Sequence, residues 1–242
     1  GTWTSVTLTE DTVPTSFDFS SDGTKMYVLG TTNDTVYQYT LATAWDVTTA
    51  VYTQNFSVLT QDTATTDLFF SPDGLKMYVA GDTVNAVLEY TLSTAWNVTT
   101  ATYTQQFSVA SQEGSVSGIF FKPDGTKMYI VGSGSDAVFQ YTLSTPWNTS
   151  TATYDTKTIS VLAQDTLSSA MWITSDGATM YMMGSTADSI FQYALATPWD
   201  ISTATYTGNT VFVGHIEASP NEFFFNESLG KLWVGGTSSD AI

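Results

Sequence analysis

The hydrophobic pattern of this chain is that of short strands separated by tight turns. In one segment, Gly118 to Phe121 is apolar at consecutive positions, as in a strand that is buried on both faces. The turn Pro123-Asp124-Gly125 and a second strand over 127–131 follow. Residues 137–143 alternate between apolar and polar side chains, and a fourth strand is predicted over 154–161. No stretch has a helical period.

This pattern repeats along the whole chain. The hairpin marker Asp-Gly recurs with spacings of 51, 51 and 52 residues, at Asp22, Asp73, Asp124 and Asp176, and an altered copy stands at Ser228. Five positions after each marker comes an aromatic residue: Tyr27, Tyr78, Tyr129, Tyr181 and Trp233. The common register predicts a single domain, 1–242, with units of about 1–51, 52–102, 103–153, 154–205 and 206–242, the last one incomplete.

Four strands per unit match the blade of a β-propeller. The runs from Phe70 to Tyr78 (FSPDGLKMY) and from Phe121 to Tyr129 (FKPDGTKMY) resemble YVTN-type propeller repeats. The linking segment from Thr94 to Tyr103 is similar to arrays in marine phage and bacterial surface proteins. We therefore predict an all-β, five-bladed β-propeller of four-stranded antiparallel blades. The N-terminal strand, Trp3 to Thr9, is expected to complete the last blade, and a larger array is the alternative.

The charge and composition of the chain limit the classes of binding partner that we expect. The 242 residues include 6 lysines, no arginine and 23 acids, and the formal net charge is −17. Such a field repels nucleic acids and anionic membranes, so neither is expected as a partner. There is no cysteine and no apolar run long enough for membrane insertion. The composition is typical of an extracellular protein, on a cell surface or a virion, and the start at Gly1 indicates a mature or excised piece.

Acidic side chains recur on one face of the predicted ring. Eleven residues before each marker lies an acid: Asp11, Asp62, Glu113, Asp165 and Glu217. Twelve residues after each marker lies another side-chain oxygen: Asp34, Asn85, Asp136, Asp188 and Asp240. Carboxylates are calcium ligands, so a Ca²⁺ site at the first set is one hypothesis. The alternative is that these acids accept hydrogen bonds from turn amides. No other cofactor is expected.

Tryptophans recur on the opposite face. Each lies 23 residues after a marker and is followed by Asp or Asn: Trp45-Asp46, Trp96-Asn97, Trp147-Asn148 and Trp199-Asp200. An aromatic ring can cover the apolar face of a sugar while the neighbouring amide or carboxylate binds its hydroxyls. These eight residues are the predicted ligand site. The alternative is that each indole packs beneath its own hairpin.

The sequence argues against catalysis. Asp18 and Glu222 lie in predicted inner strands, but neither belongs to a distinctive motif. The single histidine, His215, has no nucleophile beside it, and no phosphate loop or nucleophile elbow is present. We therefore predict a protein that is not an enzyme.

The functional hypothesis is a multivalent, lectin-like module that recognises a glycan or another cell-surface receptor. One alternative is a structural or protein-docking propeller in a larger assembly. Another is a calcium-binding propeller.

Overall fold

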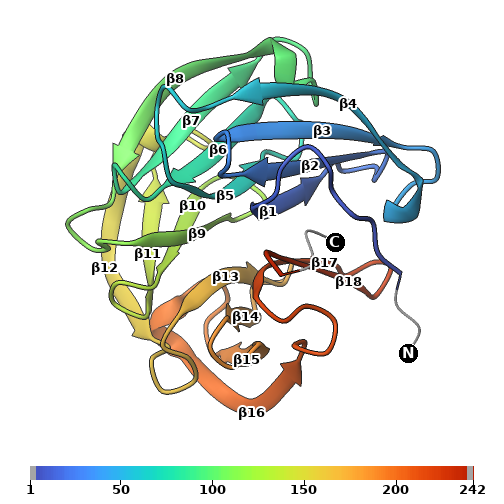
Figure 1. Ribbon diagram of the computed structural model, residues 1–242. Coiled ribbons are helices and arrows are strands. Elements are labelled where there is room, and N and C mark those ends of the chain that lie inside the picture. Colours follow the sequence, from blue (N-terminus) through green and yellow to red (C-terminus); the bar gives the residue numbers. More distant parts are fainter. Residues whose placement is uncertain (1–3, 239–241) are drawn as a thin grey trace.

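The computed structural model describes residues 4–238 and 242, and these form strands arranged in five sheets around one axis (Figure 1). Four of the sheets contain four antiparallel strands each, and the fifth contains two. The protein is therefore an all-β propeller. The prediction of five four-stranded blades is wrong, because among the described residues the last sheet has only β17 and β18.

The strands follow the chain in the order of the blades. The first two blades are β1 (Pro14–Phe19), β2 (Lys25–Gly30), β3 (Thr35–Leu41), β4 (Ala50–Ser57), β5 (Thr65–Phe70), β6 (Lys76–Gly81), β7 (Ala86–Leu92) and β8 (Ala101–Ser108). The next two are β9 (Val116–Phe121), β10 (Lys127–Gly132), β11 (Ala137–Leu143), β12 (Ala152–Ser160), β13 (Ser168–Ile173), β14 (Thr179–Gly184), β15 (Ser189–Leu195) and β16 (Ala204–Phe212). The fifth sheet is β17 (Pro220–Asn226) and β18 (Lys231–Gly236).

Short 3₁₀ helices precede the outer strands of the four complete blades: η1 (Val47–Thr49), η2 (Val98–Thr100), η3 (Thr149–Thr151) and η4 (Ile201–Thr203). No helix among the described residues is long and apolar enough to cross a membrane.

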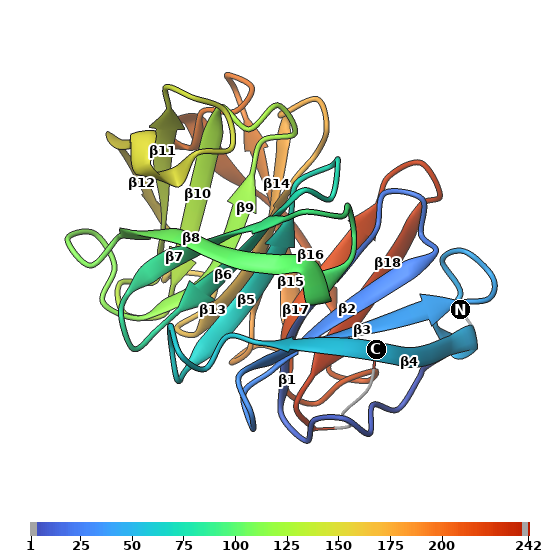
Figure 2. The ribbon, with the colours of Figure 1, turned by 90° about the horizontal axis from the view of Figure 1, so that it is seen from above.

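The inner strands close a ring. Contacts run from β1 to β5, β9, β13 and β17, and β17 contacts β1 again. Figures 1 and 2 show the outer strands β4, β8, β12 and β16 at the rim of this ring. The second strand of each complete blade is almost wholly buried, whereas the outer strands alternate between exposed and half-buried residues. Each sheet thus has two apolar faces, and the neighbouring sheets cover both of them.

Polar bonds join each of the first three blades to the next one along the chain. The Tyr27, Tyr78 and Tyr129 hydroxyls donate to the backbone carbonyls of Trp96, Trp147 and Trp199, at 2.8, 2.7 and 2.9 Å. A polar residue in the third strand then accepts from the amide two positions beyond that Trp. The three acceptors are Gln38, Glu89 and Gln140, and the donors are Val98, Thr149 and Ile201. Two bonds therefore fix the loops of Trp96, Trp147 and Trp199 against the preceding blade.

The N-terminal segment lies beside the fifth sheet. The backbones of Val6 and Ile242 exchange two hydrogen bonds, at 3.1 and 3.2 Å. Val6 stands two residues before buried Leu8, as Phe56 stands before buried Val58 in the first blade. The predicted outermost strand began at Trp3, which lies outside the described residues.

Candidate functional site: an axial cavity with aromatic walls and a carboxyl floor

A cavity of about 230 Å³ lies on the axis of the ring, and all five inner strands line it. Residues of the first hairpin turns form its mouth, among them Ser21, Pro72, Pro123 and Glu227. Because neighbouring residues of a strand point to opposite sides, residues two positions apart in each inner strand share a direction. The cavity is therefore built from two layers of side chains.

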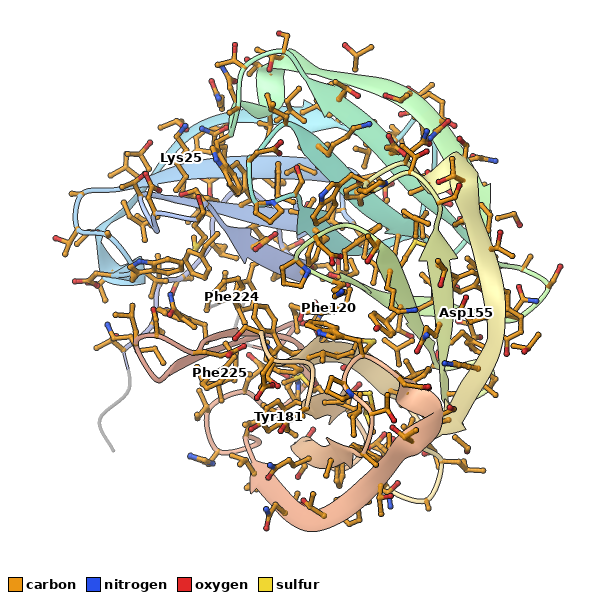
Figure 3. The ribbon with its side chains drawn as sticks, turned by 180° about the vertical axis from the view of Figure 1, so that it is seen from behind. Lys25, Phe120, Asp155, Tyr181, Phe224 and Phe225 are labelled. Carbon is orange, nitrogen blue, oxygen red and sulfur yellow. The ribbon has the colours of Figure 1, made fainter. Side chains whose placement is uncertain are left out.

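The outer layer is aromatic in four blades and acidic in the first. Four positions before the turn markers stand Phe69, Phe120, Trp172 and Phe224, and Asp18 takes the equivalent place in β1. Neighbouring rings meet edge to face. Their centroids are 5.7 Å apart from Phe69 to Phe120, 5.3 Å from Phe120 to Trp172 and 5.1 Å from Trp172 to Phe224. Figure 3 shows Phe120 and Phe224 near the middle of the ring.

The inner layer is acidic and small. The equivalent register positions hold Ser16, Asp67, Gly118, Ala170 and Glu222, and of these Asp67 and Glu222 line the cavity. The Ser16 hydroxyl donates to Asp67 at 2.6 Å, and the amides of Leu68 and Ile119 donate to the two oxygens of the same carboxylate. Glu222 donates a carboxyl proton to Asp67, so these two acids share one proton.

Burial has the largest effect on the pKa values of the acids that line the cavity, Asp18, Asp67 and Glu222. Removal from water raises the pKa of Glu222 well above its usual range, and the charge of Asp67 raises it further. Burial likewise raises the pKa of Asp18 to about 7, although the amides of Phe19 and Phe70 donate to its carboxylate. Burial also raises the pKa of Asp67, so all three acids that line the cavity floor hold a proton more readily than exposed acids do.

Asp67 is the member that sequence reasoning missed. The sequence pattern identifies Asp18 and Glu222 as inner-strand acids, whereas Asp67 lies in the apolar context of β5. Its signal was available: an acid six residues before a turn marker, at the same register position as Glu222. Only the closure of the ring brings the two together, since they are far apart in the sequence.

The predicted tryptophans pack on their own hairpins. A Cβ placed on Gly23, Gly74, Gly125 or Gly177 would lie 2.2–2.4 Å from an indole atom of Trp45, Trp96, Trp147 or Trp199. The four indoles are half-buried, and their backbones have φ of 61–65°, which is rare for a bulky residue. Trp96 also lines the axial cavity, and Trp45 lines a shallow hollow beside it together with Trp172 and Phe224.

The Asp or Asn that follows each Trp caps a 3₁₀ helix. The side chains of Asp46, Asn97, Asn148 and Asp200 accept from the amides of Thr48, Thr99, Ser150 and Ser202. Asp200 also pairs with Lys157 at 2.6 Å. The use of these eight residues in binding stays a prediction, and the structure gives each of them a local partner as well.

The acids of the opposite face are buried and bind amides. Asp11, Asp62, Glu113, Asp165 and Glu217 each accept from the amide two residues ahead, on Val13, Ala64, Ser115, Leu167 and Ser219. Amides of the second hairpin turn also donate to these acids, as Val84 does to Asp62. Within residues 4–238 and 242, no three His, Cys, Asp or Glu side chains form a group that could hold a metal ion.

The second predicted oxygen set forms the turn before the third strand. Asp34, Asn85, Asp136 and Asp188 have φ of 44–47°, and their carbonyls accept from the start of the next loop, as Asp34 does from Val58. Asp240 lies outside the described residues.

Comparison with known proteins identifies the fold. No protein-family model and no curated protein matches the sequence. A candidate 6-phosphogluconolactonase from Bacteroides uniformis is 14% identical with a TM-score of 0.57, over 82% of this chain and 55% of that one. The periplasmic gluconolactonase of Pseudomonas aeruginosa is 18% identical with a TM-score of 0.54, over 91% and 56%. Hydrazine synthase of Kuenenia stuttgartiensis is 16% identical with a TM-score of 0.58, over 93% and 56%.

These similarities show a propeller fold, and the chain spans little more than half the length of those three proteins. The narrower resemblance to YVTN-type repeats has no matching family behind it. The prediction that the protein is not an enzyme is wrong as an inference from its architecture, because two of the three similar structures are named as lactonases. Their low identity assigns no activity to this chain.

The packing of the indoles on the turn glycines can be tested with a matched pair of variants. Gly74 and Gly230 both have a left-handed backbone, with φ of 68° and 60°, but a Cβ on Gly74 meets Trp96 whereas nothing lies within 4 Å of one on Gly230. Gly230→Ala should cost about 1 kcal/mol of unfolding free energy, and Gly74→Ala about 2–4 kcal/mol, since Trp96 must move. Equal losses in chemical denaturation would mean that the indole does not rest on the turn in solution.

The buried carboxyl of Asp18 should make stability depend on pH. Its folded pKa of about 7 lies above its unfolded value, so the folded protein retains a proton that the unfolded chain releases. The stabilisation is complete below pH 4 and is lost as pH rises through 7, at up to about 1.4 kcal/mol per pH unit. Asp18→Asn should flatten the slope between pH 5 and 7 in urea denaturation. The control Asp22→Asn removes a group whose pKa is lowered by turn hydrogen bonds, and it should leave that slope unchanged.

Proposed function

We propose that the protein binds an unphosphorylated saccharide unit in the axial cavity and in this way recognises a glycan outside the cell. The observation that carries the proposal is the ring formed by Phe69, Phe120, Trp172 and Phe224 and completed by Asp18. Aromatic faces cover the C–H surfaces of a sugar, and carboxyls accept from and donate to its hydroxyls. The cavity supplies both kinds of group within about 230 Å³, enough for one ring-sized ligand.

The charge of the residues that line the cavity limits the classes of sugar that could bind there. The lining includes Asp18, Asp67, Glu222 and Glu227 but no Lys, Arg or His. A phosphate in this cavity would meet carboxylates and no compensating cation, which disfavours a phosphorylated ligand. Neutral or amino sugars remain, and the overall charge of −17 points the same way.

The rim tryptophans favour a ligand longer than one sugar. Trp96 borders the cavity, and the hollow lined by Trp45 adjoins it through Trp172 and Phe224. A glycan with one residue in the cavity could extend along this hollow. Separate sites at the four Trp loops would instead give several equal sites per chain. The number of ligands bound per chain therefore distinguishes the two arrangements.

Isothermal titration with neutral mono- and oligosaccharides, selected on a glycan array, tests this proposal. We expect one site per chain, binding that survives EDTA, and a loss of about tenfold or more in affinity for Trp172→Ala. The control Asn148→Ala changes a rim loop that does not border the cavity, and it should bind normally. Four sites per chain, or unchanged affinity of Trp172→Ala with lost affinity of Asn148→Ala, would move the site to the Trp loops.

Hydrolysis of the bound sugar is a second candidate function, favoured by the shared proton of Asp67 and Glu222. A carboxyl with a raised pKa can keep its proton and act as a general acid. The lactonase names of two similar structures make sugar lactones the natural substrates to try alongside glycosides.

Turnover of unphosphorylated sugar lactones and aryl glycosides tests this second function. Glu222→Gln should reduce the rate by about 100-fold or more while the variant still binds the sugar, because it removes the acid and keeps the shape. Circular dichroism verifies its fold. Retained binding with no turnover above the spontaneous rate in the unmodified protein would leave recognition as the function.

A further inference from the structure

Asp18 interrupts the aromatic ring of the axial cavity and is itself buried. It lines the cavity at the position that an aromatic residue occupies in the other four blades. The residue is only 8% exposed. A carboxylate that is removed from water needs donors for its oxygens and a compensating charge. The contacts that Asp18 lacks therefore indicate what the cavity binds.

The oxygens of Asp18 keep unused acceptor sites. A carboxylate has about four lone-pair sites. Among residues 4–238 and 242, Asp18 accepts from the amide of Phe19 on one oxygen, at 2.7 Å, and from the amide of Phe70 on the other, at 2.9 Å. About half of its acceptor sites are therefore left for a donor in the cavity.

Asp67, at the floor of the cavity, is the contrasting case. It accepts from a hydroxyl, two amides and a carboxyl, which belong to Ser16, Leu68, Ile119 and Glu222. These donors account for its lone-pair sites. The floor is thus paired within the protein, whereas Asp18 can still accept from a ligand.

No positive side chain balances the acids of the cavity. The described residues that line it include no Lys, Arg or His, but they include four acids, Asp18, Asp67, Glu222 and Glu227. Lys122, which precedes a lining residue in the sequence, instead pairs with Asp124 at 2.7 Å. Burial without a counter-charge raises the pKa of Asp18 to about 7. A cation in the cavity would supply that charge.

The aromatic wall favours an organic cation over a metal ion. The faces of Phe and Trp rings attract an ammonium group that lies within about 6 Å of the ring centre. A metal ion such as Ca²⁺ instead needs several oxygen ligands. No three His, Cys, Asp or Glu side chains in the described part of the chain are grouped to hold a metal ion. Rings and carboxyls together therefore suit an ammonium group on a carbon skeleton.

We propose that the axial cavity selects a sugar with a free amino group, whose ammonium binds the Asp18 carboxylate while its ring lies against the aromatic wall. This inference rests on the proposed saccharide site and names the class of sugar that the site takes. The ammonium donates to the unused acceptor sites of Asp18 and also balances its charge. The hydroxyl of a neutral sugar would fill the same acceptor sites without balancing the charge.

A further acid at the mouth of the cavity supports the same choice. Glu227 is exposed and accepts from the amide and the hydroxyl of Ser175, both at 2.8 Å. The indole N–H of Trp172 also donates to it, at 3.4 Å. The hairpin turn of the fifth sheet thus places a negative charge beside one ring of the wall. A cationic ligand meets a favourable potential from the mouth of the cavity to its floor.

Three sugars that differ only at C2 test the proposal: glucosamine carries an ammonium there, glucose a hydroxyl and N-acetylglucosamine a neutral amide. Isothermal titration at pH 6.5 should give binding of glucosamine about tenfold or more tighter than that of either neutral sugar. Asp18→Asn should abolish this preference and change the affinity for glucose less than about threefold. The control Asp82→Asn removes one charge from a turn that does not line the cavity, and it should keep the preference.

The pH dependence of binding gives a readout that a merely structural Asp18 would not. Because the ammonium binds the ionised carboxyl, the affinity for glucosamine should fall about threefold or more from pH 6.5 to pH 5, as Asp18 gains a proton. The affinity for glucose should change less. The other titratable groups near Asp18 are Asp67 and Glu222 in the cavity, Glu227 at its mouth and Tyr27 in the adjacent strand. Asp18→Asn leaves these groups in place, so it should flatten the pH dependence.

The outcomes separate this inference from the proposed function. Equal affinity for glucosamine and glucose, or a preference that survives Asp18→Asn, would overturn the inference and leave the saccharide site standing. Binding of none of the three sugars would overturn both. Circular dichroism verifies the fold of Asp18→Asn. The exposed Glu227→Gln is a second variant that keeps the side-chain shape, and it should weaken the binding of glucosamine about threefold relative to glucose.

Discussion

Each sheet of this protein has two apolar faces, and exposure of either face to water would be energetically unfavourable. The second strands are buried almost throughout, with Met26, Tyr78 and Tyr129 fully covered, and this burial comes from the adjacent sheets rather than from a separate core layer. Hydrophobic clusters accordingly lie between blades, each drawing residues from two sheets. In the ring, each complete blade is covered by its neighbours, and the axial cavity is a consequence of this arrangement.

The inner edges explain why acids stand on the axis. An inner strand pairs on one side only, so some of its amides face the centre of the ring, where a buried unpaired N–H is costly. Asp18 accepts from Phe19 and from Phe70 of the next blade, and Asp67 accepts from Leu68 and Ile119 in the same way. These carboxyls accept hydrogen bonds from backbone amides that would otherwise be unpaired, and they also make the lining of the cavity acidic.

Departure from the repeat gives the axial cavity its mixed aromatic and acidic lining. Four blades place an aromatic ring in the outer layer, and the first places Asp18 there. At the register position that Asp67 and Glu222 share, the third and fourth blades carry Gly118 and Ala170 in place of an acid. A fully symmetric repeat would either fill the centre with rings or crowd it with mutually repelling charges.

The strand pattern, the turns and the period of about 51 residues are local properties, so the sequence alone determined the all-β repeat and the propeller class. It also placed the Trp residues and their Asp or Asn neighbours on common loops, and it identified Asp18 and Glu222 as inner-strand acids. Only the tertiary structure decided which residues meet. The pairing of Asp67 with Glu222 joins β5 to β17 across the closed ring, and no local pattern encodes the distance between them. The packing of each indole on a turn glycine likewise depends on a neighbour that is not adjacent in the chain. The burial and hydrogen bonding of a residue depend on the neighbours that the fold places around it, whereas strands and turns depend mainly on the local sequence.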